Sequence, residues 1–180
     1  MSLTSAPAPA LHRHGQLARR LSAALDSPWL TAAAITAVGV VGAGVSFGLA
    51  GGNPTADGTH TLPALWPPDF VFWAVWLVIY PASGVALSLV WRRRRDADVR
   101  GAVAAFGLMN VANLLFLPVS GLVGGLPSVL TIMDLNGVVS VYVLAWLFSR
   151  YEARAALWML PYLIWMPLTS ALKAWYWILN

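Results

Sequence analysis

Apolar residues dominate five long runs of this chain, and short polar segments separate the runs. The runs cover about residues 28–50, 68–91, 101–121, 127–148 and 155–178. Each is close to the about 20 residues that an α-helix needs to cross the hydrocarbon core of a bilayer. A helix also satisfies its backbone hydrogen bonds internally, as a segment in lipid must. The pattern predicts an all-α integral membrane protein, a bundle of five transmembrane helices forming one domain over residues 28–180.

The segment before the first run, residues 1–27, has a different composition. It opens with alternating alanines and prolines and continues with basic residues. We expect a disordered start and then a basic segment lying on the membrane surface. Arg19-Arg20 before an apolar run resembles a secretory signal, but the run is longer than the about 7–15 residues typical of such signals. We therefore interpret it as a membrane span.

Prolines and glycines modify the predicted helices. Pro67 and Pro68 end a loop and start the second helix, where their missing N–H groups cost nothing. Pro161 and Pro167 are expected to kink the fifth helix. In the first helix, Gly44-x-x-x-Gly48 allows another helix to approach closely. Packing within the monomer is favoured there over a dimer seam.

Composition and charge fit a membrane protein. Of the 180 residues, 59% are hydrophobic and only 10% are charged, against about 25% charged residues in soluble domains. The net charge of +4 does not indicate nucleic-acid binding, because the arginines lie in the segments before residue 28, at 92–100 and at 150–154. The connections 51–67 and 122–126 contain no Lys or Arg. The positive-inside rule then predicts a cytoplasmic N-terminus and an outer C-terminus, which we place in a bacterial cell membrane.

An aromatic stripe follows the double proline. Phe72, Trp76 and Tyr80 are spaced by four residues, which places three rings on one helix face. Packing against neighbouring helices is one interpretation. With Trp66 at the helix entrance, the other is a site for a flat apolar ligand.

Polar residues within the runs are the second candidate feature. They are Asn110, Asn113, Asp134, Asn136 and Lys173. Polar and ionised groups are costly in a bilayer, so each is expected to face the bundle interior. Their depths allow Asn113, Asp134, Asn136 and Lys173 to share one layer, and we predict an Asp134–Lys173 contact. The layer either holds the helices together or binds the polar edge of a ligand.

No metal site or cofactor is expected. The chain has no cysteine, and His60 has no companion ligands in the sequence. No nucleophile–base pair or phosphate loop is present either, which favours a binding protein over an enzyme.

Two motifs resemble the TspO/MBR family, the tryptophan-rich sensory proteins related to the mitochondrial translocator protein. They are Pro67-Pro68-x-x-Val71-Phe72-x-x-x-Trp76-x-x-x-Tyr80 and Pro161-Tyr162-Leu163-Ile164-Trp165. The resemblance implies a five-helix bundle, commonly a homodimer, with a pocket under the 51–67 connection. It also implies tetrapyrrole ligands such as protoporphyrin IX, with sterols in animal members. Trp76, Tyr80 and Trp165 would line the pocket, with Trp66 near its lid.

The chain departs from the family pattern in three places. Leu65 stands where the family has a Trp before the double proline. Asn113 follows Asn110 where a Trp is expected, and Leu172-Lys173 replaces a Leu-Asn.

The favoured function is a membrane receptor, sensor or carrier for a flat apolar ligand. The predicted ligand-binding residues are Trp66, Phe72, Trp76, Tyr80, Asn110, Asn113, Asp134, Trp165 and Lys173. One alternative is light-dependent porphyrin degradation, with Trp66 and Trp165 as reactive rings. Another is proton- or ion-coupled transport through Asp134 and Lys173.

Overall fold

Prolines and glycines set the ends of the long helices. Pro28 begins the first of them, and the Oγ of Ser27 caps it by accepting from the N–H of Leu30 at 3.4 Å. Pro127 likewise occupies the first turn of a helix. The turn before it contains Gly124 and Gly125 at φ of 59° and 68°, a left-handed conformation that glycine adopts without strain.

The structure is a computed structural model that describes residues 20–51 and 60–180. Its long helices are α2 (Pro28–Leu49), α3 (Asp69–Arg92), α4 (Arg100–Leu122), α5 (Pro127–Tyr151) and α7 (Leu160–Leu179), with the short η1 (Arg93–Arg95) and α6 (Ala153–Trp158). Residues 20–25 are also helical, and the described residues form no strand. The all-α fold class is confirmed. The prediction for the first residues of the chain falls on residues 1–19, outside the described part.

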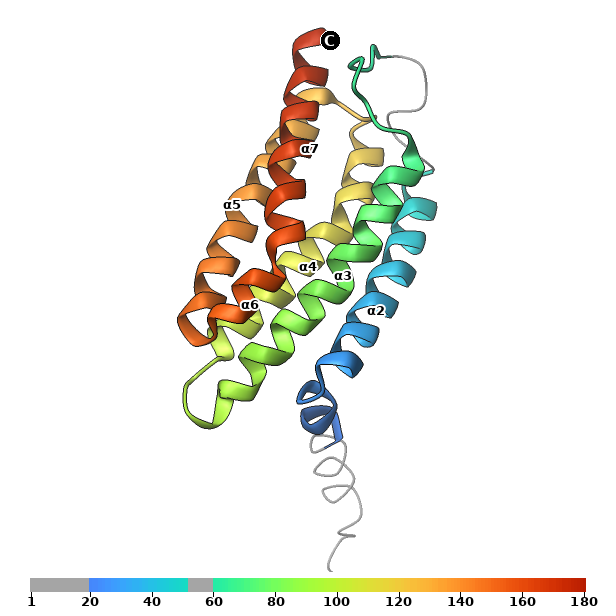
Figure 1. Cartoon of the computed structure of the whole chain (residues 1–180). Helices are drawn as coiled ribbons and strands as arrows, with labels where there is room; N and C mark the ends of the chain where they lie inside the picture. The colour runs from blue at the N-terminus through green and yellow to red at the C-terminus, as the bar shows by residue number, and fades with distance from the viewer. Residues whose placement is uncertain (1–19, 52–59) are drawn as a thin grey trace, which may run out of the picture.

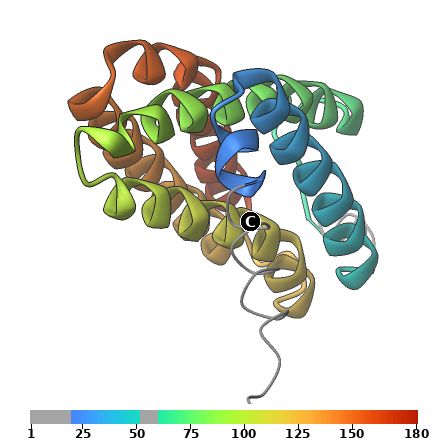
Figure 2. The same ribbon diagram turned by 90° about the horizontal axis from the view of Figure 1, so that it is seen from below.

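The long helices lie lengthwise beside one another in a bundle (Figure 1). Helix α2 packs on α3 and α4, and α5 packs on α4 and α7. Residues 20–25, η1 and α6 lie at one end, which Figure 2 views from below. The C-terminus, residues 60–67 and the α4–α5 turn lie at the other.

Within the described residues, four helices are long and apolar enough to cross a membrane. They are Pro28–Leu49, Asp69–Arg95, Arg100–Leu122 and Pro127–Tyr151. Helix α7 has 20 residues, so its length suits a fifth crossing. Five crossings remain a prediction.

The predicted fifth helix, 155–178, is in fact two helices. Helix α6 ends at Trp158, Met159 forms a turn, and α7 begins at Leu160. Pro161 explains the break, because its ring clashes with the carbonyl of Leu157 and it has no N–H to donate. Pro161 instead occupies the first turn of α7, while Pro167 lies inside that helix.

The glycines that permit close helix packing differ from those predicted. A Cβ on Gly44 or Gly48 would meet nothing within 4 Å, so the predicted packing of this pair within the monomer is wrong. Gly39 performs this role on α2, since a Cβ there would lie 2.7 Å from the ring of Tyr80. On α3, a Cβ on Gly84 would lie 2.6 Å from the Cα of Ala32.

Two ion pairs join segments at the arginine-rich end. Arg94 donates to Asp26 at 2.5 and 2.8 Å, and Arg93 pairs with Glu152 at 2.5 Å. These hydrogen bonds lower the pKa of Asp26 and of Glu152 below their ordinary values. The pairs tie the segment before α2 and the start of α6 to the end of α3.

Candidate ligand-binding cavity

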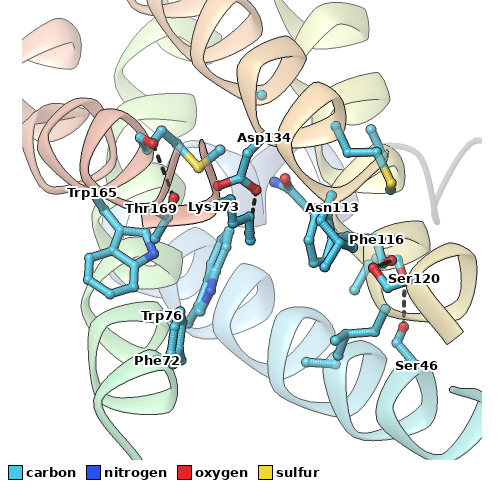
Figure 3. Close-up of a pocket in the computed structure, with 18 of the residues that line it drawn as sticks. Ser46, Phe72, Trp76, Asn113, Phe116, Ser120, Asp134, Trp165, Thr169 and Lys173 are labelled. Atoms are coloured by element: carbon cyan, nitrogen blue, oxygen red, sulfur yellow. Dashed lines mark hydrogen bonds and ion pairs between the residues drawn. The ribbon is translucent and has the colours of Figure 1, made fainter. Parts of the chain in front are cut away.

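A cavity of about 410 Å³ lies among α2, α3, α4, α5 and α7 (Figure 3). It is lined by the first half of α3 and the second half of α4, so it occupies the part of the bundle towards the C-terminal end. Ligand pockets commonly have volumes of roughly 300–1,000 Å³ and apolar linings. The cavity is of a size to hold a small organic molecule.

Aromatic rings form one wall of the cavity. Phe72 contacts Trp66 and Trp165, with centroid separations of 6.0 and 5.6 Å. Trp76 lies 5.2 Å from Tyr80. All five rings line the cavity. They offer large apolar surfaces, with a polar group on each Trp and Tyr, and they favour stacked or edge-on contacts with another ring.

The segment after the undescribed residues 52–59 packs against the C-terminal end of α7. The N–H of Thr61 donates to the Oδ1 of Asn180 at 2.7 Å, and the Nδ2 of Asn180 donates to the carbonyl of Thr61 at 2.9 Å. Tyr176 contacts the rings of His60 and Trp66 at 5.7 and 5.6 Å. These contacts hold Trp66 at the cavity.

A buried ion pair also lines the cavity (Figure 3). The Nζ of Lys173 donates to the Oδ1 of Asp134 at 2.5 Å, which confirms the predicted contact. The Nζ also lies 4.2 Å from the ring centroid of Phe116, a cation–π distance. The Oδ2 of Asp134 is buried and has no hydrogen-bond partner among the described residues.

The asparagines of α4 occupy different environments. Asn113 lines the cavity, and its Nδ2 donates to the hydroxyl of Tyr162. Asn110 does not line the cavity; its Nδ2 donates to the carbonyl of Phe106 on its own helix at 2.9 Å. Its predicted place in the site is therefore corrected. On α5, Asn136 lines the cavity but is exposed, contrary to its predicted inward position.

The structure brings eight of the nine predicted residues, all except Asn110, to this one cavity. Their role in binding remains a prediction. The sequence interpretation missed Ser46, whose Oγ donates to the carbonyl of Leu114 at 2.6 Å. It also missed Thr169 and Ser120, which line the cavity too. Small hydroxyl residues are common in membrane helices, so no sequence signal distinguished these three.

Among the described residues, no group of three His, Cys, Asp or Glu side chains could hold a metal ion.

An aromatic-lined cavity among membrane-length helices is typical of membrane proteins that bind small ligands. The profile of the TspO/MBR family matches residues 26–178, and the chain belongs to this family. It is similar to the Tryptophan-rich protein TspO of Archaeoglobus fulgidus, with 28% identity over 145 residues, 76% of this chain and 91% of the relative. Family membership identifies it as an integral membrane protein of the sensory and binding type.

Proposed function

We propose that the cavity binds a flat apolar ligand, and specifically a tetrapyrrole such as protoporphyrin IX. The observation that carries the proposal is the ring wall of Trp66, Phe72, Trp76, Tyr80 and Trp165 around one cavity. A conjugated macrocycle would place its faces and edges against these rings.

The polar residues that line the rest of the cavity are evidence for a ligand with both apolar and polar parts. Asn113, Asp134 and Lys173 lie together on one side of the cavity. A tetrapyrrole has an apolar body and polar substituents on its edge, so its body would meet the rings while its polar edge meets this group. Binding would then serve sensing, sequestration or delivery, without bond-making by the protein.

The experiment is a binding titration of purified protein in detergent, followed by quenching of tryptophan fluorescence. Protoporphyrin IX, haem and a sterol are compared. We expect saturable quenching by protoporphyrin IX. A sterol that binds while both tetrapyrroles fail to bind would refute the tetrapyrrole assignment, and failure of all three would refute the binding proposal.

A second function, ion-coupled transport, is favoured by the buried Asp134–Lys173 pair, because ionisable groups in the membrane often mark proton or ion pathways. Its test is ligand flux into sealed vesicles. Flux that is unchanged by Asp134→Asn would reject transport through this pair.

The orientation follows from the arginine-rich end of the bundle, which we place in the cytoplasm by the positive-inside rule. Since the chain has no cysteine, Asp96→Cys and Thr61→Cys each create a single thiol at opposite ends. An impermeant thiol reagent applied to intact cells should label Thr61→Cys only. Labelling of Asp96→Cys alone would reverse the orientation.

We also propose that the protein forms the homodimer that the family resemblance implies. Gly44 and Gly48 leave part of α2 open to a second copy, because no other segment among the described residues lies within 4 Å of an added Cβ. Gly44→Ile should then reduce dimer formation in chemical crosslinking. An unchanged dimer fraction would exclude this surface.

A further inference from the structure

The ammonium of Lys173 can donate more hydrogen bonds than the one described for it. An ammonium carries three N–H donors, and the hydrogen bond described for it goes to the Oδ1 of Asp134. The side chain lines the cavity and is 11% exposed, so a molecule in the cavity can reach it. It is also the only lysine in the sequence, and every other basic side chain except histidine is an arginine outside the apolar runs.

Asp134 is also incompletely hydrogen-bonded. Its Oδ1 accepts a hydrogen bond from the Lys173 ammonium at 2.5 Å, while its Oδ2 is buried without a described partner. A buried carboxylate is stable only when its charge and its oxygens are compensated. Another carboxylate that brings an apolar body to fill the cavity could therefore compete with Asp134 for the ammonium.

We propose, on the basis of the proposed function, that Lys173 anchors a carboxylate of the ligand and that Asp134 occupies Lys173 while the cavity is empty. When the ligand carboxylate pairs with Lys173, Asp134 is released and takes up one proton from solvent. The uptake follows because an ionised carboxylate without a cation is costly in a buried site. The summed charge of Asp134, Lys173 and, when it is bound, the ligand carboxylate is zero before and after binding.

The other ionisable groups that line the cavity or lie beside it are three tyrosines, Asp69 and His60, and His60 contacts Tyr176 without lining the cavity. Tyr80 on α3 and Tyr162 and Tyr176 on α7 are phenols, which ionise only near pH 10 in water. Asp69 lies at the cavity edge in the first turn of α3 and is exposed. The lining residues contributed by α2 and α4 include no ionisable side chain. Asp134 is thus the buried carboxylate available to take the proton.

The test compares protoporphyrin IX with its dimethyl ester, which has the same macrocycle and no carboxylate. The wild-type protein should bind the acid at least about tenfold more tightly than the ester at pH 6. This preference should fall as the pH rises, by up to about tenfold per pH unit for one coupled proton. In Asp134→Asn, Lys173 is released from its partner, so the acid should bind more tightly and with no pH dependence.

Two further variants serve as controls for misfolding and for indirect effects on ligand binding. The double variant Asp134→Asn/Lys173→Gln removes both charges together and leaves neither unpaired; it should bind acid and ester equally. Glu152→Gln makes the same carboxylate-to-amide change far from the cavity, in the pair with Arg93, and should keep the wild-type preference.

A covalent test uses the single lysine. A carbodiimide joins a carboxylate to an adjacent amine as an amide and takes up the lost water as a urea. With protoporphyrin IX bound, the product at Lys173 should be heavier by the mass of the porphyrin less one water, whereas the dimethyl ester should give no such product.

The outcomes separate the two proposals. If neither porphyrin binds, the proposed function fails. If both bind with equal affinity to the wild type and the double variant, and no porphyrin is coupled to Lys173, the cavity binds tetrapyrroles but the anchoring role of Lys173 is overturned.

Discussion

The side chain of Asn180 forms two hydrogen bonds with the backbone of Thr61, at 2.7 and 2.9 Å. They join the end of α7 to the segment that carries Trp66, although the two residues are 119 positions apart in the chain. The pair therefore fixes the cover of the cavity.

Asn180→Ala should loosen this cover. Two neutral hydrogen bonds contribute about 0.5–1.5 kcal/mol each, so the Thr61 amide should exchange with deuterium about tenfold or more faster. Bound ligand should also dissociate faster. An unchanged exchange rate at Thr61 would show that other contacts hold the segment.

Gly84→Ala should destabilise the fold. Its Cβ would lie 2.6 Å from the Cα of Ala32 and 2.9 Å from the carbonyl oxygen of Thr31, and this backbone cannot move without separating α2 from α3. We expect a loss of about 1–3 kcal/mol in the free energy of unfolding, as for other overpacked sites. Gly107→Ala on α4 is the matched control, because a Cβ there meets nothing within 4 Å. Equal stability of the two variants in a denaturant titration would contradict the helix packing.

The Asp134–Lys173 pair should show strong coupling in stability. Asp134→Asn leaves a buried ammonium without its counter-charge, which typically costs about 3–5 kcal/mol. Asp134→Asn/Lys173→Gln should cost less than the sum of the single variants, by at least about 1 kcal/mol in a double-mutant cycle. Additive losses would mean that the two charges do not stabilise each other.

Acid should weaken the tie between Asp26 and Arg94. The hydrogen bond from Arg94 lowers the pKa of Asp26, so its contribution is present above the unfolded value of about 3.9 and is lost as the pH falls through the lower, folded value. Because the Asp26 side chain is 35% exposed, solvent limits the effect to about 1 kcal/mol at most. Between pH 6 and pH 3, the melting temperature of the wild type should fall further than that of Asp26→Asn. An equal fall in the melting temperatures of the two proteins would contradict the pairing of Asp26 with Arg94.

The sequence predicted the first four long helices well because lipid imposes a simple rule of length and polarity. Helix α2 was expected over residues 28–50 and runs over Pro28–Leu49. Asp134 and Lys173 were expected together because their depths in the membrane place them in one layer, and the ion pair agrees.

The orientation of individual helix faces was harder to predict. Lipid tails and the protein core are both apolar, so hydropathy does not tell which side of a membrane helix faces inward. This is why Gly44 and Gly48 were assigned to internal packing, whereas Gly39 and Gly84 provide it. Asn110 was misplaced for a related reason, because a polar residue in an apolar run can also be satisfied by its own helix backbone.

The central claim is that the indole-lined cavity holds the ligand, and Trp165→Leu tests it most directly. Trp165 is 7% exposed and lines the cavity, whereas Trp29 is 75% exposed and lies outside it. Stacking on an aromatic side chain is worth about 0.5–1.5 kcal/mol beyond area burial, so Trp165→Leu should weaken protoporphyrin IX binding about tenfold. Trp29→Leu should leave the affinity unchanged. Equal affinities of both variants and the wild type would contradict the account.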